Sequence, residues 1–168
     1  LKAQTEVGQF DVACNNFKQK YGFYPPQRFT LPIQAVGTDQ NFQLLAKMFP
    51  GWARNVTAAP PAPPTNLTWV VQPPKQPGAA GLPPSFAGGH ELVGIQCLVF
   101  FLGGPQNQGW DPANPTSTTP PSGNTKQGPF YDFVESRIDD KLNYKDPWDN
   151  PFAYLSCGSG DAYPVAPL

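Results

Sequence analysis

The chain has little of what most catalytic sites are built from. His90 is its one histidine, and Cys14, Cys97 and Cys157 are too far apart for a CxxC metal or redox motif. A zinc site that began at His90-Glu91 would lack a second histidine, and a cysteine nucleophile would have no histidine base other than His90. The sequence therefore argues against zinc and cysteine catalysis.

Charges and long apolar runs are scarce as well. The net charge is −1 and charged residues make up 14% of the chain, with the basic ones scattered, so no nucleic-acid surface is predicted. No apolar run approaches the roughly 18 residues of a membrane-spanning helix. Prolines and glycines are abundant instead, 23 and 16 of 168 residues, which is typical of a loop-rich extracytoplasmic protein. We expect one domain over residues 1–168, with irregular insertions at 58–85 and 103–129.

A helix is predicted at the start of the chain, over residues 1–21. Apolar residues recur there every three or four positions, which places them on one stripe of a helix. Glu6 and Lys18 fall on the opposite, solvated face. Gly22 and Pro25-Pro26 then end the helix. The predicted packing face consists of Val7, Phe10, Cys14, Phe17 and Tyr21.

A second helix is predicted over residues 39–49. Thr38 or Asp39 can cap its start, and Pro50-Gly51 follows its end. Its inward-facing residues are expected to be Phe42, Leu45 and Phe49.

The most apolar segment, residues 90–102, is compatible with a buried strand or a buried helix. Its length and the helical spacing of Leu92, Ile95, Val99 and Leu102 favour a helix, with His90-Glu91 in its first turn. Residues 107–112 are then expected to form a surface loop.

Short strands are predicted late in the chain, at 137–144, 151–157 and 162–166. They would form a small antiparallel sheet in the region 137–166, against which the N-terminal helix packs. This arrangement is an α+β fold with the helix on one face of the sheet.

One segment, residues 144–156, combines two turn-forming pairs with a tryptophan. Asp146-Pro147 and Asn150-Pro151 favour turns, because an Asx side chain bonds nearby backbone and proline restricts φ. Trp148 lies between them and is expected to be buried, since a large aromatic side chain usually anchors a core. Phe152 and Tyr154 follow with strand-like spacing. The pattern holds no nucleophile and no metal-ligand spacing, so it predicts a structural role.

This segment resembles a signature of the major pseudopilins of type II secretion systems and of related pilin-like proteins, Asp-Pro-Trp-Gly-Asn-Pro-Tyr/Phe-x-Tyr. The matching residues here are Asp146, Pro147, Trp148, Asn150, Pro151, Phe152 and Tyr154. Asp149 stands in place of the glycine and can still adopt left-handed backbone. Gly22-Phe23-Tyr24-Pro25 resembles the exit of the family's long N-terminal helix.

The resemblance implies a pilin-like α+β fold and a non-catalytic structural subunit of a pilus or pseudopilus-like filament. Residues 1–21 would be the C-terminal half of a long helix whose apolar half precedes Leu1 and anchors the protein in the inner membrane. The implied partners are other pilin-like subunits and the secretion or pilus assembly machinery, in the periplasm or at the cell surface. Calcium is the one cofactor to consider, because 156–161 is similar in character to the family's calcium loop. The later part of that pattern is absent, so we assign no ligands.

Two alternatives stay open. The dispersed tryptophans at 52, 69, 110 and 148 could serve a secreted module that binds carbohydrate or protein. The acidic residues of the C-terminal third could serve an extracytoplasmic hydrolase, although their separation across a cleft cannot be read from sequence. A Cys97–Cys157 disulfide is conceivable, although the distance between the two Cα atoms cannot be read from sequence.

Overall fold

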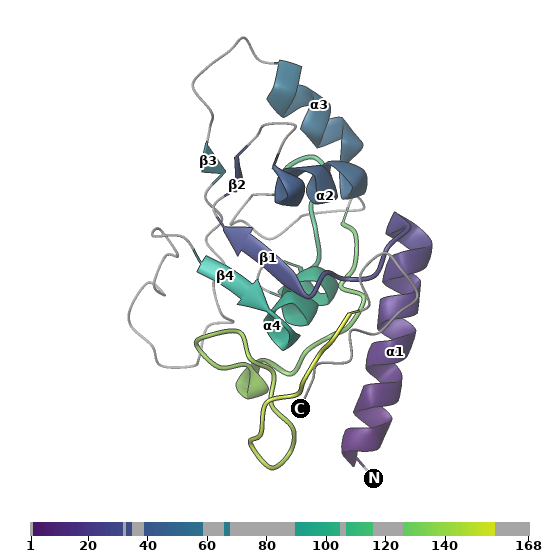
Figure 1. The fold of residues 1–168 in the computed structure, drawn as a ribbon. Coiled ribbons are helices and arrows are strands. Elements are labelled where there is room, and N and C mark those ends of the chain that lie inside the picture. The colour runs from purple at the N-terminus through teal and green to yellow at the C-terminus, as the bar shows by residue number, and fades with distance from the viewer. Residues whose placement is uncertain are drawn as a thin grey trace.

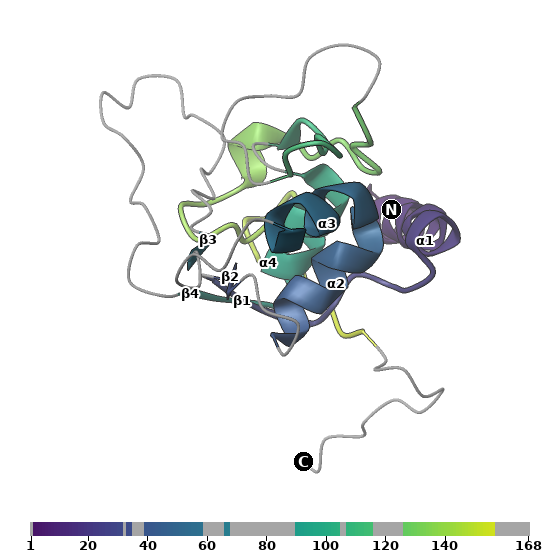
Figure 2. The same cartoon turned by 90° about the horizontal axis from the view of Figure 1, so that it is seen from above.

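The computed structural model describes residues 2–31, 33–34, 39–58, 66–67, 90–104, 107–115 and 126–156. It has the predicted mixed α+β character, with helices beside two small antiparallel sheets of two strands each (Figure 1). Seen from above, α1 stands to one side of the other helices and the short strands lie toward the opposite side (Figure 2). The elements are α1 (Lys2–Tyr21), β1 (Arg28–Leu31), β2 (Ile33–Gln34), α2 (Gln40–Met48), α3 (Pro50–Ala58), β3 (Asn66–Leu67), β4 (His90–Val93), α4 (Ile95–Leu98), a π-helical turn (Val99–Gly103) and a 3-10 turn (Glu135–Arg137).

The predicted N-terminal helix is confirmed, and one residue of its packing face is wrong. Phe10, Cys14 and Phe17 are buried and Tyr21 is partly buried. Val7, however, is 54% exposed. Glu6 faces inward instead and pairs with the guanidinium of Arg137. Gly22, at φ +83°, ends the helix as expected, donating its N–H to the Lys18 carbonyl at 2.7 Å.

The second predicted helix is α2. The Asp39 carboxylate caps it by accepting the N–H groups of Asn41 and Phe42, at 2.8 and 3.2 Å. Its predicted inward residues are buried. Pro50, predicted to follow the end of helical structure, instead begins α3, because proline suits the first position of a helix.

The segment 90–102 combines the two structures that its composition allowed. Residues 90–93 form β4, which pairs antiparallel with β1, so the predicted helical first turn at His90-Glu91 is wrong. Leu92 stays buried in the strand, which is why the apolar pattern alone did not reveal it. Gly94, at φ +54°, separates the strand from the helix, which runs on from Ile95 into the π-helical turn. Every residue of 95–102 is buried, and all of them are apolar except Gln96, whose side chain is hydrogen-bonded to the Val93 N–H and the Lys141 carbonyl.

The predicted C-terminal sheet is wrong for the residues that the structure describes. Within 126–156 the only bridges between neighbouring segments of that region are the single pairs Ile138–Tyr144 and Lys145–Pro151. The candidate strand 162–166 lies outside the described residues, as does most of the predicted insertion 58–85. α1 therefore packs against the π-helical turn and a cluster of aromatic side chains rather than on a sheet.

That aromatic cluster forms the centre of the molecule. Trp110, predicted to lie in a surface loop, is fully buried instead. Its ring lies against Phe49 and Phe100, with centroids 5.5 and 5.1 Å away, and its indole N–H donates to the Phe101 carbonyl at 3.2 Å. The burial of Trp110 is possible because this N–H finds an acceptor inside the core.

Candidate functional site

Two successive loops near the end of the described chain have the same hydrogen-bonded geometry. In the first Asp loop (residues 139–143), Asp139 Oδ1 accepts the N–H groups of Lys141 and Asn143, at 2.9 and 2.8 Å. Its Oδ2 accepts the Asn143 amide at 3.0 Å, and its own N–H donates to the Asn143 carbonyl at 3.0 Å. Leu142 has φ +65°. One carboxylate thus organises the whole loop.

The second Asp loop (residues 146–150) repeats this arrangement inside the segment that carries the resemblance. Asp146 Oδ1 accepts the N–H groups of Trp148 and Asn150, at 2.8 and 2.9 Å. The Asp146 N–H donates to the Asn150 carbonyl at 2.7 Å. Asp149 has φ +71°, so the predicted left-handed backbone at this position is confirmed. Lys145 Nζ lies 2.9 Å from the Asp149 carboxylate.

The hydrogen bonds hold both carboxylates in their charged form. Those from the backbone and side chain of Asn150 lower the pKa of Asp146. Burial acts to raise the pKa of Asp139, but the hydrogen bonds from Asn143 and Lys141 outweigh it and lower that pKa. Asp139-x-x-x-Asn143 and Asp146-x-x-x-Asn150 share one spacing in the sequence, but Asp11 and Asn15 inside α1 share it too, so the spacing alone does not predict the loops.

Arg137 joins these loops to the first turns of α1. Its guanidinium pairs with both carboxylate oxygens of Glu6, with Nη2–Oε2 at 2.9 Å, and Nε donates to the Lys145 carbonyl at 2.7 Å. It also lies 4.5 Å from the centre of the Tyr144 ring. The hydrogen bond to Glu6 raises the pKa of Arg137. The predicted solvated position of Glu6 is therefore wrong.

The structure brings together the two segments that carry the resemblance. The Tyr154 hydroxyl donates to the Pro25 carbonyl at 2.7 Å, which links the C-terminal segment to the exit of α1. Phe152 packs edge-on against Phe10 of α1, with ring centroids 5.3 Å apart. The sequence predicted that the N-terminal helix packs against the region 137–166, but it predicted neither of these two residue pairs.

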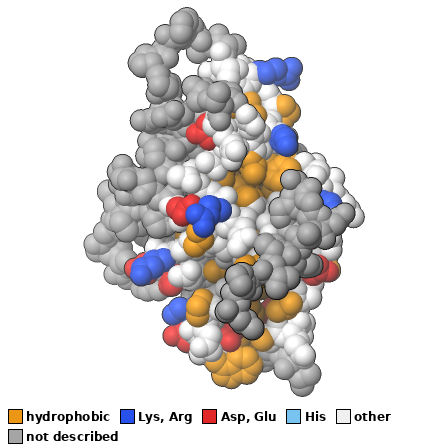
Figure 3. Space-filling view, viewed as in Figure 1, with side chains coloured by type: hydrophobic (Ala, Val, Ile, Leu, Met, Phe, Trp, Pro, Cys, Tyr) orange, Lys and Arg blue, Asp and Glu red, His pale blue; other side chains and the backbone are white. Residues whose placement is uncertain are grey.

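Trp148 does not occupy the predicted position. It is 67% exposed rather than buried. The third position of each Asp loop faces outward, and Lys141, its counterpart in the first loop, is exposed as well. The loop geometry therefore presents the tryptophan to solvent. Figure 3 shows exposed hydrophobic side chains at the lower end of the molecule, where Figure 1, drawn from the same side, shows a yellow-green loop.

A groove of about 320 Å³ lies between α1, α4 and the segment 152–156; we call it the α1 groove. Phe10 and Cys14 lie in its wall, and Val7 and Leu155, both exposed, border it. The other lining residues are Asp11, Tyr24, Ile95, Leu98, Phe152, Ala153, Tyr154 and Ser156.

The thiols of Cys14 and Cys97 are free, buried and unsuited to nucleophilic chemistry. Burial, with a contribution from Asp11, raises the pKa of Cys14 to about 11. Burial, with a contribution from Glu91, raises that of Cys97 to about 12. Both are therefore protonated near neutral pH. Cys157, the other member of the conceivable Cys97–Cys157 pair, lies outside the described residues.

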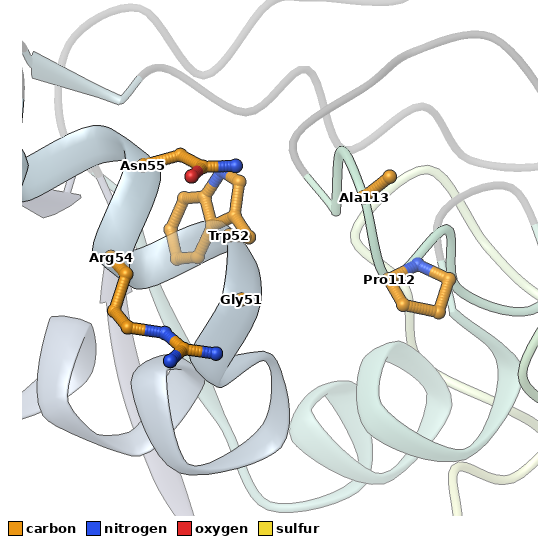
Figure 4. A pocket seen from close by; sticks show the side chains of 6 residues that line it. All are labelled: Gly51, Trp52, Arg54, Asn55, Pro112 and Ala113. Carbon is orange, nitrogen blue, oxygen red and sulfur yellow. The ribbon is translucent and has the colours of Figure 1, made fainter.

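A second, wider depression of about 590 Å³ lies between α3 and the loop that follows Trp110 (Figure 4). Trp52, Arg54 and Asn55 border it on one side, and Pro112 and Ala113 face them from the other. These lining residues include neither a carboxylate nor a histidine that could act as a general base.

The described part of the chain holds no cluster of three or more histidine, cysteine, aspartate or glutamate side chains fit for a metal ion. The candidate calcium segment 156–161 falls almost wholly outside it. Of the helices in the described ranges, none combines the length and hydrophobicity of a transmembrane span. Comparisons with protein-family models, curated proteins and solved structures find no match to this chain.

Proposed function

We propose that this chain is the globular part of a structural subunit of a pilus or pseudopilus-like filament, of the kind found in type II secretion. One observation carries the proposal. The two segments that resemble pilin-like proteins, around Pro25 and at 146–154, contact each other through the Tyr154–Pro25 hydrogen bond. Two segments that carry the resemblance and lie far apart in the sequence are thus in contact, which supports the proposal.

The position of α1 fits such a role. The helix stands at the flank of the molecule (Figure 1), with Phe10 and Phe17 buried against the domain and the opposite side exposed. In the proposed subunit an apolar half precedes Leu1, anchors the protein in the inner membrane and stacks with other subunits on assembly. The Glu6–Arg137 pair and the Phe10 contacts fasten the helix to the domain, so a displacement of the helix moves the domain with it.

The residues encoded before Leu1 test the proposal. We expect a short basic leader, a glutamate at the fifth position of the mature chain and about 20 apolar residues. The chain extended by these residues should form filaments visible by electron microscopy when expressed with its assembly machinery. A cleavable secretory signal that ends near Leu1 would refute the proposal.

A second candidate function, a secreted binding module, is favoured by the exposure of Trp148. An exposed tryptophan on a rigid loop can stack on a sugar ring or on an aromatic group of a partner. Titration with a panel of oligosaccharides, followed by tryptophan fluorescence, tests this function. Saturable binding that Trp148→Ala abolishes would support the module over the filament subunit.

A further inference from the structure

The second Asp loop presents a rigid apolar knob. Trp148 is the largest of the exposed hydrophobic side chains among the described residues. The Asp146 carboxylate holds the Trp148 and Asn150 N–H groups, and the Lys145–Pro151 bridge closes the base of the loop. Little conformational freedom of the backbone is then left to lose when the indole is covered, which favours binding.

The α1 groove offers a matching apolar depression. Val7, Tyr24 and Leu155 all line it, and all three are large hydrophobic side chains exposed to solvent. Its volume of about 320 Å³ lies at the lower end of the range for ligand-binding pockets, which suits one large side chain rather than an extended ligand.

Knob and groove are separate places on one molecule. Trp148 is not among the residues that line the α1 groove, and its side chain is 67% exposed. The knob therefore does not occupy the groove of its own chain. A knob and a groove at separate places on one molecule produce a head-to-tail contact, and repetition of that contact builds a ring or an open helical filament.

We infer that Trp148 of one copy inserts into the α1 groove of the next copy. This contact rests on the proposed filament function and specifies how neighbouring globular domains meet. The charges around the two surfaces are few. The loop bears Lys145, Asp146 and Asp149, one negative charge in excess. The groove lies beside Asp11 and Lys18, whose charges balance, since Lys18 Nζ is 4.3 Å from the ring centre of the groove residue Tyr24.

The contact is weak between separate molecules. A tryptophan buries roughly 150–250 Å², whereas a stable interface buries about 800 Å² on each partner. We therefore expect dissociation constants of about 1 mM for the isolated domain. In a filament the N-terminal helices hold neighbouring subunits together. The effective concentration of knob and groove is then high, so most of these contacts are formed.

Complementary variants test the inference in solution. Trp148→Ala removes the knob and leaves the groove, whereas Ala153→Phe fills the groove from an exposed position and leaves the knob. Wild-type protein should show NMR shifts of the Trp148 indole and of the Leu98 methyl groups that grow with concentration up to about 1 mM. Each variant alone should lose these shifts, and an equimolar mixture should regain them, because the mixture again contains one knob and one groove.

Three outcomes would overturn the inference. They are wild-type spectra that do not change with concentration, self-association that survives in either variant alone, and a mixture that does not recover the shifts. Self-association that survives in Ala153→Phe but not in Trp148→Ala would indicate a symmetric Trp148–Trp148 contact. A photo-cross-linking residue in place of Trp148 gives an independent readout, since its products should map to residues 152–156 or α1 of a second copy.

The filament proposal can fail separately. If the extended wild-type chain assembles and Trp148→Ala assembles equally well, the knob contact is wrong and the filament function stands. If the residues before Leu1 encode a secretory signal, the filament function is wrong even where the solution contact is measured. Saccharide binding at Trp148 that competes with the concentration-dependent shifts would assign the tryptophan to the binding module instead.

Discussion

The two Asp loops have one backbone design and opposite surroundings. In both, an aspartate carboxylate gathers the N–H groups of the loop and the fourth residue has positive φ. In the first loop that fourth residue is Leu142, which is buried, and Gln96 of α4 donates from its side-chain amide to the Lys141 carbonyl at 2.8 Å. In the second loop it is Asp149, whose side chain is exposed. The first loop is anchored in the core through Leu142, and the corresponding residue of the second loop is exposed.

The comparison separates local from tertiary causes. In both loops the aspartate and the asparagine four residues later supply the bonds locally, since every bond involved lies within a few residues. The spacing is not sufficient by itself, because Asp11 and Asn15 share it inside α1. Whether a loop is buried depends on what lies beside it. Gln96 and the core hold the first loop at Lys141 and Leu142, whereas Trp148 and Asp149 of the second loop are exposed.

The largest effect is expected where the loops differ most. Leu142→Ala should lower the free energy of unfolding by about 2–5 kcal/mol, because it leaves a cavity in the core. Trp148→Ala, in the exposed loop, should change it by no more than about 0.5 kcal/mol. Chemical denaturation followed by circular dichroism measures both, and a reversed order would show that burial does not distinguish the loops.

Arg137 ties both loops to α1, so its removal should affect them together. Its ion pair with Glu6 is largely buried, with side-chain exposures of 21% and 17%. We expect Arg137→Ala to cost roughly 1–3 kcal/mol, and Arg137→Lys to rescue little because lysine cannot form the bidentate pair. The matched control is Arg28→Ala, which breaks the exposed ion pair with Glu91 and should cost less than about 1 kcal/mol. Equal losses in thermal or chemical unfolding would contradict the role of Arg137.

The acid sensitivity of the fold should depend on the loop carboxylates. The pKa of Asp139 is lower in the folded protein than in the unfolded chain, so its charge stabilises the fold above the unfolded pKa, and this contribution is lost as the pH falls through the folded pKa. Unfolding measured from neutral pH to about pH 2.5 should show stability falling below about pH 4. Asp139→Asn should flatten this dependence, while Asp140→Asn on the exposed side of the loop should keep it. Identical slopes would exclude the Asp139 hydrogen bonds as a source of stability.

The smallest effect is expected at the left-handed positions. Asp149→Gly should stabilise the protein by less than about 1 kcal/mol, because glycine adopts positive φ without steric cost and the lost pair with Lys145 is exposed. Leu142→Gly relieves the same backbone cost but removes a buried side chain, so it should destabilise. A destabilising Asp149→Gly would mean that the Lys145–Asp149 pair outweighs the backbone preference.

Most of the helical structure could be predicted from the sequence, and the contacts of the candidate site could not. Periodicity located α1 and α2. Gly22 marked the end of α1, and Asp39 marked the start of α2. The Tyr154–Pro25 and Glu6–Arg137 contacts join residues more than a hundred positions apart, so no local pattern could reveal them. The same limit explains Trp110, whose burial depends on a carbonyl of the π-helical turn.

The sequence by itself determined the local geometry: the end of α1 at Gly22, the cap at Asp39, and the turn at Asp146 with its left-handed Asp149. These features follow from φ preferences and from hydrogen bonds that span a few residues. The tertiary structure decided that residues 90–93 form a strand, because β1 supplied the pairing edge. It also decided that Glu6 rather than Val7 faces the domain and that Trp148 faces solvent, because burial depends on the partner that the fold places beside each side chain.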